Sequence, residues 1–89
     1  MIDFVTMLSI VTMIVGVLMS GGYFTQTLKI WKNKSAKDVS ILTYYIFGSG
    51  VAIWLLYGII IKNWVIIIAN AVAEVGALSV LISYYIHGH

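Results

Sequence analysis

Long stretches without charged side chains are the feature that most constrains this chain. No Asp, Glu, Lys or Arg occurs between Asp3 and Lys29 or between Asp38 and Lys62, and the stretch after Lys62 contains only Glu74. A helix that crosses a bilayer needs about 20 predominantly apolar residues. The pattern therefore predicts three membrane-spanning helices. We expect them at residues 4–28, 41–61 and 64–86.

The three helices account for almost all of residues 1–89, which predicts one all-α membrane domain. The opening MIDF lacks the positive charge of a secretory signal, and the first apolar stretch is longer than the apolar region of a signal peptide. We therefore expect the first helix to be retained.

The composition excludes several classes of function. Only 9% of the residues are charged, against about 25% in a typical soluble domain. A net charge of +2 cannot support binding along a phosphate backbone, which excludes nucleic acid as a partner. There is no cysteine, and both histidines lie in the tail, so the sequence shows no metal or cofactor site and no nucleophile–base pair. We therefore expect neither an enzyme nor a cofactor.

The lysines predict the orientation in the membrane. Four of the five lie within residues 29–37, and the second connection is only Lys62-Asn63. We expect the protein in the inner (plasma) membrane of the cell. The positive-inside rule then places the first connection in the cytoplasm, the N-terminus outside and the tail His87-Gly88-His89 inside. The short second connection predicts that helices 41–61 and 64–86 are antiparallel neighbours. Asp38 and Ser40 are candidate N-caps for helix 41–61.

The first helix carries a stripe of small and hydroxylated residues with an average spacing of 3.6. Such a stripe is typical of close helix packing in membranes, and it also suits the lining of a polar pathway. Its members are Ser9, Thr12, Gly16, Ser20, Tyr23 and Thr27.

The second helix carries an aromatic face that includes a deep tryptophan. Trp54 lies about 12 Å inside Lys62, deeper than an interfacial aromatic belt, whereas Trp31 and Trp64 flank the spans as belt residues do. A deep indole N–H needs an acceptor, so Trp54 either packs against a neighbouring helix or lines a pathway. The face comprises Thr43, Phe47, Gly50, Trp54, Tyr57 and Ile61.

The third helix brings polar groups deep into the membrane. Asn70 and Glu74 share one face, about 9 and 15 Å below Trp64, so that Asn70 and Trp54 lie at similar depth. An intramembrane acid is a functional hypothesis by default, but it can also be protonated and bonded within the bundle, and both interpretations of Glu74 remain open. A second face of small residues predicts helix packing. It comprises Ala69, Ala73, Gly76 and Ser83.

An aromatic face beside an amide suits a neutral, polyhydroxylated ligand. The C–H faces of a sugar stack on an indole ring, and its hydroxyls bond to an amide that both donates and accepts. No cationic side chain lies within the spans to bind an anion. Three helices cannot enclose a pathway alone, so self-association is expected.

Three segments resemble bacterial SemiSWEET sugar transporters of the PQ-loop superfamily: YFTQTLKIWKNKSAKDVS, GVAIWLLYG and IIIANAV. The resemblance covers nearly the whole chain. It implies a three-helix bundle in which the third helix lies between the first and second, assembled as a parallel two-fold homodimer of six helices around a central sugar site. It also implies that Trp54 and Asn70 of each protomer contact substrate and that Tyr57 belongs to an extracellular gate.

The chain departs from the family pattern at three places. The family's Pro-Gln pair near the cytoplasmic end of helix one is Thr25-Gln26 here, so the proline hinge is missing. The extracellular connection has Lys62 and Asn63 where some relatives carry an Arg and Asp that can pair. Glu74 stands where an apolar residue is expected, so no role transfers to it.

The sequence predicts facilitative transport (uniport) of small neutral sugars by alternating access. Its partners would be the sugar, membrane lipid and a second copy of the chain. Residues that could also line the pathway are Ser20, Tyr23, Gly50 and Glu74. One alternative is a proton-coupled small-molecule exporter that uses Glu74, and another is an accessory or structural membrane subunit.

Overall fold

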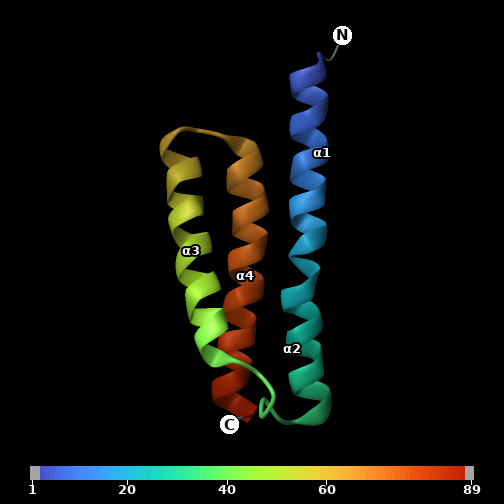
Figure 1. The fold of residues 1–89 in the computed structure, drawn as a ribbon, viewed down its shortest axis with the longest axis vertical. Helices are drawn as coiled ribbons and strands as arrows, with labels where there is room; N and C mark the ends of the chain where they lie inside the picture. Colours follow the sequence, from blue (N-terminus) through green and yellow to red (C-terminus); the bar gives the residue numbers. More distant parts are fainter. Residues whose placement is uncertain (1–2, 88–89) are drawn as a thin grey trace.

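The computed structural model describes residues 3–87, so Gly88 and His89 of the predicted tail lie outside the described part. It consists of four helices that form three membrane-length rods (Figure 1). They are α1 (Phe4–Met19), α2 (Gly21–Asn33), α3 (Ile41–Ile60) and α4 (Trp64–His87). Helices α1 and α2 follow each other end to end, and their combined span, Phe4–Asn33, is long and apolar enough to cross a membrane, as are α3 and α4. The prediction of an all-helical protein with three spans is confirmed.

The first span continues beyond its expected end at residue 28 and stops at Asn33. Lys32 lies in its last turn and Lys29 in the turn before, where flexible ammonium groups can reach the aqueous interface and complement the helix dipole. Lys34 then adopts the left-handed conformation, with φ at 52°, and donates its backbone N–H to the Ile30 carbonyl. Charge alone therefore underestimated the length of this helix.

A break at Ser20 divides the first span into α1 and α2. The Ser20 Oγ and the Ser20 backbone N–H both bond to the carbonyl of Gly16, at 3.0 and 3.1 Å. Gly21 and Gly22 follow, and no side chain crowds either of them. A serine beside glycines is a common site of helix distortion, and Figure 1 shows the offset between the two segments.

Side-chain caps begin α1 and α4, but not α2 or α3. The Thr6 N–H donates to Asp3 Oδ1 at 2.8 Å, and hydrogen bonding by the Thr6 side chain, and then by its backbone, lowers the pKa of the exposed Asp3 carboxyl. Asn63 Oδ1 accepts from the Ile66 N–H at the start of α4. Ser40 is the N-cap of α3, but it makes no cap bond to the backbone, because its hydroxyl accepts from Thr43 instead. The predicted N-cap position at Ser40 is therefore confirmed, but neither Ser40 nor Asp38 accepts a bond from a backbone N–H of α3.

Helix α4 lies between α3 and the α1–α2 rod, the spatial order that the family resemblance implies (Figure 1). The tight turn at Lys62 and Asn63 makes α3 and α4 antiparallel neighbours, as predicted. Contact between α4 and the first span depends on small residues. A Cβ added at Gly16 would lie 2.9 Å from the Ala69 Cβ, and one added at Gly76 would lie 2.6 Å from the Tyr23 Cβ. These glycines let the helices approach closely.

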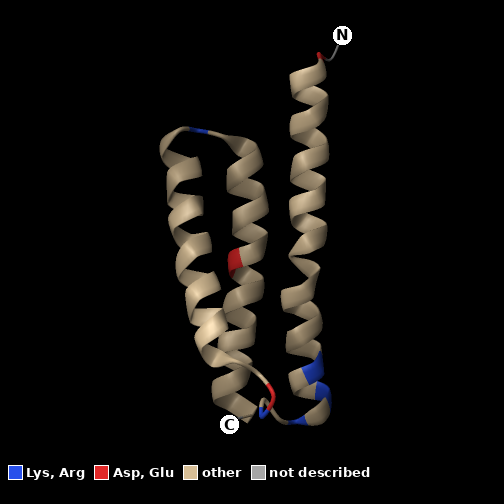
Figure 2. Cartoon of the chain, viewed as in Figure 1, with Lys and Arg blue, Asp and Glu red and all other residues tan. Residues whose placement is uncertain are grey.

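Polar bonds between the rods lie toward the end that carries the lysines. Thr27 and Ser79 hydroxyls bond at 2.6 Å, and the Trp31 indole N–H donates to Ser83 Oγ at 2.8 Å. Trp31 therefore packs against α4 as well as flanking the membrane. Charged residues gather at the ends of the rods, except for one acidic position at mid-height of α4, which is Glu74 (Figure 2).

Candidate functional site

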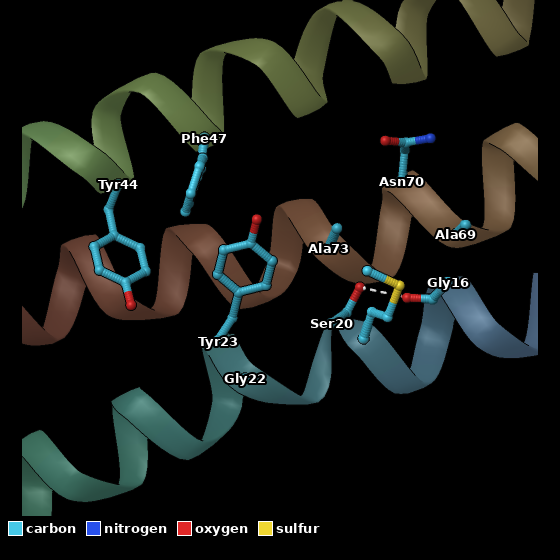
Figure 3. A pocket seen from close by; sticks show the side chains of 10 residues that line it. Gly16, Ser20, Gly22, Tyr23, Tyr44, Phe47, Ala69, Asn70 and Ala73 are labelled. Atoms are coloured by element: carbon cyan, nitrogen blue, oxygen red, sulfur yellow. Dashed lines mark hydrogen bonds between the residues drawn. The ribbon is translucent and has the colours of Figure 1, made fainter.

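A groove of about 470 Å³ opens where the three rods meet. We call it the central groove (Figure 3). The break at Ser20 helps to form it, because α1 and α2 contribute their residues from either side of that break. Its lining comprises Gly16, Met19, Ser20, Gly22, Tyr23, Tyr44, Phe47, Ala69, Asn70 and Ala73.

Three aromatic rings form one wall of the central groove. Tyr23 of α2 contacts Tyr44 and Phe47 of α3 edge to face, and Tyr44 and Phe47 contact each other in the same way. The distance between ring centroids is 6.1 Å in each of the three pairs. Figure 3 shows Tyr23 reaching from its helix toward the two α3 rings. The backbones of α2 and α3 do not approach each other, so these rings bridge the two rods on this side of α4. We call these three residues the aromatic bridge.

Asn70 supplies the amide of the central groove. Its Nδ2 donates to the Ile66 carbonyl at 2.9 Å, which fixes the orientation of the side chain on α4. Within residues 3–87 the Oδ1 accepts no hydrogen bond, and one Nδ2 hydrogen stays free. Asn70 can therefore offer one acceptor and one donor to a ligand in the groove.

Trp54 and Tyr57 lie on a different surface from Asn70. With Ile53 they line a shallow depression of about 330 Å³ on α3, and their rings meet edge to face at 5.9 Å. Trp54 is 57% exposed, and its indole N–H has no acceptor among the described residues. A Trp that packs on a neighbouring helix would be covered and bonded, so the packing interpretation of Trp54 is wrong for the single chain. We call Ile53, Trp54 and Tyr57 the aromatic face.

Glu74 does not line the central groove. It lines a separate hollow between α3 and α4, together with Tyr45, Gly48, Ser49, Ala52, Leu78 and Leu81, none of which lines the central groove. One carboxylate oxygen is buried and has no hydrogen-bond partner among the described residues. Sequence spacing put Glu74 and Asn70 on one face of α4, but α3 packs against that face and separates the two.

The other predicted residues are dispersed over the molecule. Ser20 and Tyr23 line the central groove, whereas Gly50 is half-buried on α3 and lines none of the described pockets. Thr25 is exposed and donates its hydroxyl to the Gly21 carbonyl at 2.9 Å, a bond that threonine within a helix can form. Gln26 faces a pocket beside the 34–40 loop.

Sequence reasoning missed Tyr44 as a groove residue. Tyr44 precedes Phe47 by three positions, which puts the two on one face of a helix. That spacing could have predicted that Tyr44 lies on the same face of the helix as Phe47. Only the arrangement of the rods shows that Tyr23 completes the bridge.

Comparison with known proteins decides the family. A family model described as "Sugar efflux transporter for intercellular exchange" matches residues 6–88. The chain belongs to this SWEET transporter family. Its members are transporters and not enzymes, and membership agrees with the three apolar spans of an integral membrane protein.

Curated relatives of this SWEET chain are bacterial. A sugar transporter SemiSWEET from Bradyrhizobium diazoefficiens is 33% identical over 60 residues, which cover 67% of this chain and 70% of the relative. A sugar transporter SemiSWEET from Escherichia coli is 32% identical over 57 residues, 64% of each chain. A third from Leptospira biflexa is 36% identical over 50 residues, 56% of this chain and 59% of the relative. The resemblance to bacterial SemiSWEET proteins is therefore confirmed.

A solved structure has the same fold as this SWEET chain. The crystal structure of a bacterial homologue of SWEET transporters matches with a TM-score of 0.83 and 28% identity, over 92% of this chain and 99% of that one. The all-α bundle with α4 in the middle is thus a fold that the family uses.

Proposed function

We propose that the chain carries small neutral sugars across the inner (plasma) membrane as a uniporter that works by alternating access. The observation that carries this proposal is the division of the sugar-binding groups between two surfaces. Asn70 lies in the central groove, and Trp54 lies uncovered on the aromatic face. Two copies related by an axis along the membrane normal would bring these surfaces around one cavity.

The exposed Trp54 supports assembly. A ring that is 57% exposed at mid-membrane depth gains little from lipid alone, and its N–H needs an acceptor there. A sugar hydroxyl or a group of a second protomer would supply that acceptor. In a two-fold dimer each binding residue occurs twice, so one sugar would contact two indoles and two amides. Tyr57, next to Trp54, would close the extracellular side as a gate.

The location of Glu74 argues against the proton-coupled alternative. A proton carrier must face the substrate pathway, or a group that does. Glu74 instead faces a hollow of about 320 Å³ that shares no residue with the central groove. We therefore propose a structural role for Glu74 between α3 and α4. The relatives are named sugar transporters, which argues against an accessory subunit.

The test is uptake of labelled glucose and sucrose into proteoliposomes that contain the purified protein, with and without a pH gradient. We expect uptake down the sugar gradient that is independent of the pH gradient. Asn70→Ala should remove most of it, because the variant loses both free hydrogen-bonding groups in the groove. Uptake that requires a pH gradient would contradict uniport, and uptake of neither sugar would leave the accessory role as the better account.

A further inference from the structure

A second polar pocket lies at the lysine-rich end of the molecule. It has a volume of about 210 Å³ between α2 and the 34–40 loop, and we call it the loop pocket. Its lining combines ammonium, amide and hydroxyl groups with one carboxylate. The lining residues are Gln26, Lys29, Ile30, Asn33, Ser35, Lys37, Asp38 and Val39.

The loop that closes this pocket is ordered by its own hydrogen bonds. The Ser35 N–H donates to the Ile30 carbonyl at 3.2 Å, and the Val39 N–H donates to the Ala36 carbonyl at 3.0 Å. The Lys37 N–H donates to Ser35 Oγ, and Ile30 of α2 and Ala36 of the loop are each 1% exposed. The pocket is thus formed before any ligand arrives.

The net charge of the loop pocket favours an anionic ligand. Lys29 and Lys37 contribute two positive charges and Asp38 contributes one negative charge, so the lining carries +1. Within residues 3–87 neither ammonium group forms an ion pair, and both lysines are exposed. Gln26, Asn33 and Ser35 add neutral donors. One singly charged phosphodiester would neutralise the lining and accept from several of these groups.

The depth of the loop pocket favours a lipid over a soluble anion. Its α2 residues, from Gln26 to Asn33, belong to the last turns of the first membrane span, at the level where lipid headgroups lie. Basic pockets at the cytoplasmic ends of membrane helices suit anionic headgroups.

We propose that the loop pocket binds the phosphate of an anionic membrane lipid, held between Lys29 and Lys37. The lipid sits outside the central groove and is not transported. The site is part of the individual protomer, so it depends on neither sugar transport nor dimerisation.

Two double variants with equal charge change test the proposal. Lys29→Gln/Lys37→Gln removes both ammonium groups from the pocket. Lys32→Gln/Lys34→Gln removes two lysines of the same segment that do not line the pocket. Binding of phosphatidylglycerol, and of phosphatidylcholine with the same acyl chains, is measured by native mass spectrometry of the full chain in neutral detergent. Helix content by circular dichroism confirms that each variant is folded.

We expect the parent to prefer phosphatidylglycerol and the Lys29/Lys37 variant to bind it about thirtyfold more weakly. The Lys32/Lys34 variant should bind nearly as tightly as the parent, and Asp38→Asn should bind more tightly because it removes the opposing charge. Equal losses in the two double variants, or equal binding of the two lipids, would overturn the proposal. Complete displacement of the lipid by millimolar inorganic phosphate would assign the pocket to a soluble anion and overturn it as well.

Discussion

Trp54 is an aromatic side chain that the single chain leaves uncovered at the depth where a sugar would cross. We expect Trp54→Ala to weaken sugar binding at least about tenfold, because each of two protomers loses a stacking surface worth about 1 kcal/mol. Trp64→Ala is the matched control, since Trp64 is also exposed (72%) but lies at the end of its span. Equilibrium binding of labelled sugar, which does not rely on tryptophan fluorescence, measures the effect, and uptake is measured in parallel. Equal losses in the two variants would remove Trp54 from the binding site.

Glu74 is the only acid inside the membrane spans of the described chain, and it does not line the central groove. Glu74→Gln keeps the size of the side chain and a hydrogen-bonding oxygen while removing the ability to carry a proton. We therefore expect sugar uptake within about twofold of the parent. Glu74→Leu serves as a comparison that also removes the polar group. Loss of uptake in the glutamine variant, together with pH-driven flux in the parent, would restore the proton-coupled alternative.

At the scale of the element, the first span has its distortion at Ser20 and not at the Thr25-Gln26 pair. Thr25 keeps its backbone N–H and bonds its hydroxyl to the Gly21 carbonyl, whereas a proline there would free that carbonyl and bend the helix further. We expect Thr25→Pro to accelerate exchange of labelled sugar while changing equilibrium binding little. Thr25→Ala, which removes only the hydroxyl bond, is the control.

Slower or unchanged exchange in a folded Thr25→Pro protein would show that the cytoplasmic part of the helix does not limit transport. The Ser20-Gly21-Gly22 break, or rocking of whole protomers, would then carry the conformational change.

Close contact between α2 and α4 depends on Gly76. An added Cβ would lie 2.6 Å from the Tyr23 Cβ, and neither backbone can easily yield. We expect Gly76→Ala to lower the free energy of unfolding by about 1–3 kcal/mol, the usual range for overpacking. Gly50→Ala is the matched control, because its Cβ would meet no atom within 4 Å. Thermal unfolding in detergent, followed by circular dichroism, should show a lower midpoint for Gly76→Ala alone. Similar midpoints for the two variants would contradict the packing seen here.

At the scale of the whole molecule, the open central groove and the exposed aromatic face predict a parallel two-fold dimer. Tyr57 and Ile59 lie on opposite sides of α3 and are almost equally exposed, at 51% and 52%. The chain has no cysteine, so Tyr57→Cys and Ile59→Cys each introduce a single thiol. In membranes we expect a short bismaleimide to trap a dimer through Cys at position 57 and far less through position 59. Equal trapping at both positions, or none at 57 while transport persists, would contradict the proposed assembly.

The sequence alone determined the membrane class, the number of spans and their order along the chain. Those properties follow from local composition. Moving a charged side chain into hydrocarbon has a high free-energy cost, and an uncharged stretch of about 20 apolar residues has the length of a membrane-spanning helix. The resemblance of three short segments added the family and the central position of α4. The same local logic located the small-residue faces that Gly16 and Gly76 use for packing.

Only the tertiary structure decided which deep polar residues share a surface. Asn70 and Glu74 are four positions apart on one helix, yet α3 packs between their two hollows. Trp54 and Asn70 lie at similar depth, yet the single chain keeps them on separate surfaces. Tyr23 and Tyr44 are far apart in sequence and meet across the groove. Helical spacing fixes the direction of a side chain relative to its own axis, whereas the partner it meets depends on how neighbouring helices are rotated and bent, which no single segment specifies.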